Sequence, residues 1–138
     1  MRESRLRAVL LRLALWVPTV LLGVFFVFVG IPKFLPDQPW ARMFQDWGYP
    51  HGSHLLIGGL EVLGGVLLLV PRTTRYASYL LAMIMVGATV THLIHGPLFN
   101  AAFTLGLAMV VLLLSRFHRP SRPKQAPIAP RAPGVSTV

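Results

Sequence analysis

Glu61 is the only acidic residue inside an apolar segment of the sequence, which makes its chemistry the first question. The segment HLLIGGLEVLGGVLLLVPR surrounds it between His54 and Arg72. A carboxylate at membrane depth costs about 2.5–3.5 kcal/mol on insertion scales, so a partner must offset this cost or the group must serve a function. At about 100° per residue, Glu61 shares a helical face with His54 and with two glycines, Gly58 and Gly65. We therefore expect this face to pack against protein and Glu61 to point into the interior.

Three further ionisable side chains lie near the ends of other apolar segments, where they could meet Glu61. Lys33 follows the first apolar run, and His92 and His95 close the third. Lys33 would either pair with Glu61 or steer an anionic group. His92 shares a helical face with Thr89, and two hypotheses stay open for it. A hydrogen bond between His92 and Glu61 would satisfy both groups and be purely structural, or the two would handle protons and hold the polar head of a lipophile.

Metal or haem ligation by His92 or His95 is a third hypothesis, because His-x-x-His places two imidazoles near one side of a helix. The sequence holds neither an H-E-x-x-H motif nor a Cys–His zinc pattern, so we predict no metal. The chain has no cysteine, which excludes disulfides, thiol redox relays and cysteine-ligated clusters. Any redox chemistry must therefore use a bound cofactor or a quinone.

The composition indicates what kind of domain positions these groups. The chain has 138 residues, 54% of them hydrophobic and only 12% charged, about half the charged share of a soluble domain. We therefore expect one integral membrane domain in contact with the lipid bilayer. The formal net charge is +9, but the basic residues flank apolar segments, which favours topology signals and anionic headgroups over nucleic acid.

The apolar segments predict an all-α fold, an integral membrane four-helix bundle of up-down-up-down topology. A basic leader over 1–12 precedes them, and a basic, proline-rich tail over 116–138 is expected to be disordered. A cleaved signal peptide is disfavoured, because the first apolar run is too long and lacks an A-x-A site. The transmembrane domain is predicted over 13–115, with helices at about 13–31, 55–70, 74–95 and 98–115.

The first loop, IPKFLPDQPWARMFQDWGYPHGS, is predicted to contain a short amphipathic helix on the extracytoplasmic side. Trp40 and Trp47 would lie on one side of this helix, either at the membrane interface or as a lid over a pocket. Lys and Arg concentrate in the leader, the PRTTR turn and the tail. Both termini are therefore expected in the cytoplasm, and the protein in the cytoplasmic membrane. This topology brings five polar residues into the outer half of the bundle: Lys33, His54, Glu61, His92 and His95.

The sequence resembles the DoxX and DoxX-like family of small four-helix membrane proteins over about residues 11–114. The resemblance lies in the elements VGIPKF, WARMFQDWGYP, IGGLEVLGGVLLLVPR and GATVTHLIHGP. It implies that Lys33, Glu61 and His92 match the polar positions of the family. The family includes a subunit of a thiosulfate:quinone oxidoreductase and members linked to membrane oxidoreductase complexes, although nothing in this sequence marks the thiosulfate enzyme.

Three functions follow as hypotheses. In the first, the protein serves a redox system together with a membrane or soluble partner, and a quinone or similar lipophile binds in the outer half. Glu61, His92 and Lys33 would then form the polar site, and the groups expected to contact the ligand are Trp40, Trp47, His54, Thr89 and His95. In the second, the protein is a non-catalytic accessory or assembly subunit. A transporter is the third, but no internal repeat is evident and a homo-oligomer would be needed to complete it.

Overall fold

The computed structural model describes residues 2–117, and in this part of the chain all regular structure is helical. This confirms the all-α class predicted from the sequence. Residue 1 and residues 118–138, which hold most of the expected tail, lie outside the described residues. The elements are α1 (Arg2–Gly30), the 3₁₀ helix η1 (Ile31–Phe34), α2 (Trp40–Asp46), α3 (Ser53–Leu69), α4 (Thr74–His95) and α5 (Leu98–Phe117).

Helix α1 begins well before the expected start at residue 13. Its first turns are rich in Arg, Leu and Ala, which are good helix formers, and Pro18 is the first proline of the chain. Nothing in the leader therefore stops the helix, and α1 reaches 29 residues. At 1.5 Å per residue this is about 43 Å, longer than a hydrocarbon core of about 30 Å. At the other end of the chain, α5 continues through Arg116 and Phe117, two residues that the sequence predicts to belong to the tail.

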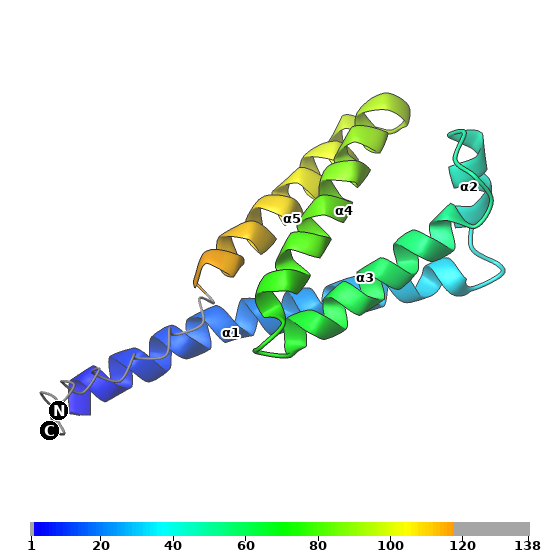
Figure 1. Cartoon of the computed structure of the whole chain (residues 1–138). Coiled ribbons are helices and arrows are strands. Elements are labelled where there is room, and N and C mark those ends of the chain that lie inside the picture. Colours follow the sequence, from blue (N-terminus) through cyan, green and yellow to red (C-terminus); the bar gives the residue numbers. More distant parts are fainter. Residues whose placement is uncertain (1, 118–138) are drawn as a thin grey trace, which may run out of the picture.

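The helices form two antiparallel pairs, α1 with α3 and α4 with α5 (Figure 1). The pairs are joined at the short turn between α3 and α4 and diverge from it, so that α2 lies near their open end (Figure 1). Buried apolar side chains from four helices fill the joined end. They are Phe26, Leu68, Ala77, Leu81, Met85, Ala108 and Val111.

Glycines hold α1 and α3 in close contact along their length. A Cβ added at Gly65 would lie 2.6 Å from the carbonyl oxygen of Gly23, and one added at Gly58 would lie 3.0 Å from that of Gly30. Only glycine permits these approaches, as small residues do between membrane helices in general. The contact between Gly30 and Gly58 fixes the register that brings the end of α1 beside the first half of α3.

Among residues 2–117, three helices are long and apolar enough to cross a membrane: 5–34, which includes most of α1, and then α4 and α5. Helix α3 is apolar as well, but its 17 residues make it the shortest of the four. Helices of about 17–25 residues span bilayers, so α3 lies at the lower limit. The chain is thus a helical membrane protein, and the complete up-down-up-down crossing stays a prediction.

Candidate functional site

Lys33 and Glu61 form an ion pair between η1 and α3. The Lys33 Nζ atom donates to Glu61 Oε2 over 2.6 Å, and both residues are buried, with exposed fractions of 5% and 4%. The pair follows from the local structure, because η1 turns the chain directly after Gly30 while Gly58 lets it approach α3. Of the two roles considered for Lys33, the structure contains the pairing with Glu61. The expectation that Glu61 points inward is confirmed.

The surroundings of Lys33 compensate its charge further. Its ammonium also donates to the carbonyl oxygen of Val29 at 3.2 Å and lies 4.8 Å from the centre of the Trp40 ring. A cation over the face of a tryptophan is attracted by the ring, and by more where water is excluded. Trp40 therefore contributes to the polar site through its π face, while its buried Nε1 atom has no hydrogen-bond partner among the described residues.

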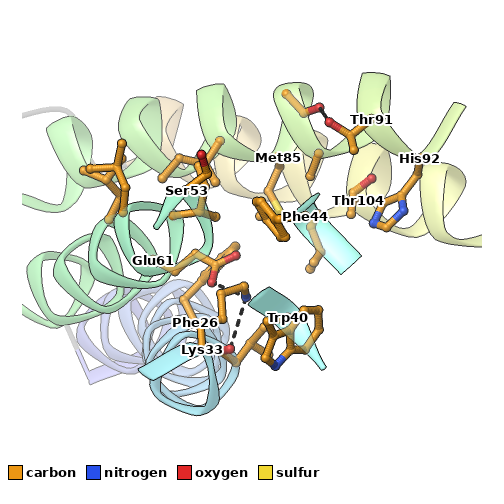
Figure 2. Close-up of a pocket in the computed structure, with 18 of the residues that line it drawn as sticks. Phe26, Lys33, Trp40, Phe44, Ser53, Glu61, Met85, Thr91, His92 and Thr104 are labelled. Atoms are coloured by element: carbon orange, nitrogen blue, oxygen red, sulfur yellow. Dashed lines mark hydrogen bonds and ion pairs between the residues drawn. The ribbon is translucent and has the colours of Figure 1, made fainter. Parts of the chain in front are cut away.

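The ion pair lies on one wall of a pocket between the two helix pairs (Figure 2). The pocket has a volume of about 630 Å³, within the range of about 300–1,000 Å³ that is typical of small-molecule sites. Its floor includes Phe26 and Met85, and His92 lies across it from Lys33 and Glu61 (Figure 2). The uncharged polar residues Tyr49, Ser53, Thr91, Asn100 and Thr104 also line it, and most of the remaining lining is apolar. All five α-helices, η1 and the loop after α2 contribute to the lining, whose apolar members include Val29, Trp40, Phe44, Trp47, Ile57, Leu60, Ile84 and Phe103.

Helix α2 and the residues after it cover the end of the pocket that lies away from the turn between α3 and α4. The Trp47 ring contacts His92 edge-on with centroids 5.7 Å apart and stacks on His95 at 6.0 Å. Tyr49 adds a hydrogen bond of 2.6 Å between its hydroxyl and that of Thr91 on α4. Of the two interpretations of this segment, these contacts favour the lid.

The hydrogen bond between Glu61 and His92, which was one of the two hypotheses for His92, is absent from the structure. Glu61 pairs with Lys33 instead, and the buried Nδ1 atom of His92 has no hydrogen-bond partner among the described residues. The reason is that α4 diverges from α3 with distance from the turn that joins them, which separates two groups that the helix registers place at similar depth (Figure 1). His92 still belongs to the site, because it lines the pocket from the opposite side.

Three of the predicted ligand contacts do not line the pocket. Thr89 is buried between α4 and α5, where its hydroxyl lies 2.8 Å from that of Thr104. His54 packs against the ring of Phe44, and His95 is exposed outside its contact with Trp47. Trp40 and Trp47 do line it. In residues 2–117 no three His, Asp or Glu side chains gather in a way that could hold a metal ion.

Sequence reasoning missed the residues that complete the pocket from apolar helix faces. Phe26, Met85 and Phe103 are indistinguishable in the sequence from residues that face lipid, so no pattern identified them. Tyr49 was detectable in principle. It follows Gly48, whose φ of 79° requires a turn at that point, and a tyrosine after an aromatic helix needs a partner for its hydroxyl.

Comparisons with known proteins agree with the motifs noted in the sequence. Residues 17–114 match the model of the DoxX-like family. A protein of Bacillus subtilis (strain 168) named "Putative oxidoreductase CatD" is 30% identical over 100 residues, which cover 72% of this chain and 71% of that protein. No solved structure matches the chain.

Proposed function

The chain belongs to the DoxX-like family, and from this premise we propose that it is the quinone-binding membrane component of a redox system. The name of its relative supports an oxidoreductase context, and the pocket supports a ligand. We place the protein in the cytoplasmic membrane with four crossings, both termini in the cytoplasm and α2 on the outer side. A membrane or soluble partner protein would exchange electrons with the quinone.

The observation that carries this proposal is the distribution of polarity in the pocket. An apolar cavity of about 630 Å³ has a buried ion pair on one wall and an imidazole on the other. A quinone needs this combination, because its ring requires apolar contacts while its carbonyl oxygens accept hydrogen bonds. Reduction to the hydroquinone takes up two electrons and two protons. Lys33, held by Glu61, would position one oxygen, and His92 would donate or accept a proton at the other side.

The experiment uses the tryptophans of the chain. Two of the three, Trp40 and Trp47, line the pocket, so a bound quinone should quench a large share of the intrinsic fluorescence. Full-length protein in nanodiscs would be titrated with a decyl-tailed benzoquinone, and lipid extracts of the purified protein analysed by mass spectrometry. Saturable quenching and a stoichiometric quinone are expected. His92→Leu should weaken binding about three- to tenfold, the effect of losing one hydrogen bond to the ligand.

A matched control is His51→Leu, since His51 is exposed and does not line the pocket. Quenching that never saturates in the wild type, together with extracts that hold only bulk lipid, would refute the proposal. Equal affinities of the two histidine variants would remove His92 from the site.

The accessory-subunit hypothesis keeps one specific observation in its favour, which is that Lys33 and Glu61 satisfy each other without a ligand. If the pair is only structural, the double variant Lys33→Met, Glu61→Leu should fold and retain full activity of the membrane redox system in cells. If the pair serves a ligand, the same variant should fold but lose quinone binding. Folding in both cases is expected because matched apolar residues commonly replace a buried ion pair without loss of stability.

A further inference from the structure

Side-chain contacts close some sides of the pocket more firmly than others. Toward α1 and α5 the rings of Phe25 and Phe103 meet edge-to-face, with centroids 6.4 Å apart. At the outer end Trp47 and Tyr49 contact α4. The remaining side lies between α3 and α4, which are joined at their turn by the hydrogen bond from the Thr74 hydroxyl to the carbonyl oxygen of Leu68, two residues that do not line the pocket.

The residues that line this remaining side are apolar and exposed. Leu56 on α3 is 65% exposed and Met83 on α4 is 73% exposed, although both line the pocket. Gly87 follows Met83 by four residues, on the same face of α4, and is exposed as well. Phe103, on the side of α1 and α5, is 50% exposed, but its ring is held against Phe25; the most exposed lining side chains, Leu56 and Met83, therefore place the main opening between α3 and α4.

The depth of this opening identifies what it faces. Gly87 lies eight residues before His95, the last residue of α4, which places it about 12 Å below the end of this candidate span. Half of a hydrocarbon core is about 15 Å, so Gly87 and Met83 lie at the depth of lipid chains. The opening therefore leads into the bilayer interior and not into water.

We infer that the pocket is loaded sideways from the bilayer and that its ligand is an amphiphile with a hydrocarbon tail. The polar head lies between the Lys33–Glu61 pair and His92, and the tail leaves between Leu56 and Met83, past Gly87. This inference rests on the proposed function and restricts it to tailed, membrane-resident quinones or lipids of the same build. Water-soluble quinones would lack the contacts along the opening.

Gly87 allows a sharp test, because an added Cβ would meet nothing within 4 Å. Gly87→Phe fills the opening without disturbing the helix contacts. Gly106 on α5 is exposed, also has nothing within 4 Å of an added Cβ and does not line the pocket, so Gly106→Phe is the matched control. Gly87→Leu is a second variant, since leucine inserts readily into membrane helices and favours the helix over glycine.

The probes are a decyl-tailed benzoquinone and the same ring with a methyl group in place of the tail, titrated by tryptophan quenching in nanodiscs. Partition of each probe into lipid is common to all variants, so ratios between variants report on the site. We expect Gly87→Phe and Gly87→Leu to weaken binding of the tailed probe at least about tenfold relative to Gly106→Phe. Binding of the tail-less probe should change by less than about twofold.

The outcomes separate this inference from the proposed function. Unchanged binding of both probes in the folded Gly87 variants would overturn the sideways loading and leave quinone binding intact. Equal loss of both probes would also overturn it, since the substitution would then act on the whole pocket. If neither probe binds the wild type, the proposed function fails, and this inference fails with it.

Discussion

The Lys33–Glu61 pair should be strongly coupled in stability. Glu61→Gln leaves the Lys33 ammonium buried without its counter-charge, a change that typically costs about 3–5 kcal/mol of unfolding free energy. The Trp40 ring, 4.8 Å from the ammonium, remains in this variant and retains an attraction of up to about 2 kcal/mol. The glutamine introduced by this substitution also keeps an oxygen that accepts from Lys33. We therefore expect Glu61→Gln to lower the free energy of unfolding by about 3 kcal/mol, the lower limit of this range, although Lys33 and Glu61 are only 5% and 4% exposed.

A double-mutant cycle measures this coupling directly. Lys33→Met, Glu61→Leu and the double variant would be unfolded in mixed micelles by titration with a denaturing detergent. Each single variant should be clearly destabilised and the double variant close to wild type, so that the coupling energy is at least about 2 kcal/mol. Asp37→Asn is the control, because Asp37 is exposed, and it should change stability by less than about 0.5 kcal/mol.

The reasoning fails if the coupling is no larger than about 0.6 kcal/mol. That is the average for neutral hydrogen bonds between membrane helices, which find substitutes in the unfolded state. Such a value would mean that the two groups are neutral or reach water in the membrane. A buried ion pair beside an apolar pocket would then be ruled out.

Three other predictions follow from the same structure. Gly58→Ala should separate α1 from α3 and lower the free energy of unfolding by at least about 2 kcal/mol, because the new Cβ would lie 2.8 Å from Lys33 Cβ. The neighbouring Gly59→Ala has its nearest contact at 3.7 Å and should lower it by less than about 0.5 kcal/mol. Unfolding measurements on both variants check this. Tyr49→Phe removes the hydrogen bond to α4 and should lower the free energy of local opening of the lid, residues 40–49, by about 0.5–1.5 kcal/mol. Amide exchange over these residues should then become faster, and unchanged exchange would mean that the lid does not depend on this bond. The sequence has no cysteine, so Asp37→Cys introduces a single thiol for labelling. A membrane-impermeant maleimide should label it from outside intact cells, and labelling only after lysis would reverse the proposed orientation.

The sequence was sufficient to predict the long helices and the side of the site that holds Lys33 and Glu61. Periodicity placed Glu61 on an inward face, and the end of the first apolar run placed Lys33 at the same end of the bundle, because both depend on positions along single helices. It was not sufficient for His92. Depth along α4 follows from counting residues, but the angle between α3 and α4 depends on how Gly64, Leu81 and the turn between them pack, and no one-dimensional pattern encodes that angle. The pocket exists because of this angle, so its apolar lining was beyond the reach of the sequence as well.

The position of the pocket also constrains how a redox partner could reach the ligand. Its polar groups lie toward the lid, while the opening between Leu56 and Met83 lies at the depth of lipid chains. An amphiphile that enters from the bilayer must therefore turn its head toward the lid, below Trp47 and Tyr49. Electrons would then have to cross the lid and not the membrane, so a partner would dock over α2. If the proposed function holds, a chain without cysteine would need no redox group of its own, because it would hold the quinone head next to Lys33 and His92, where a partner could reduce or oxidise it.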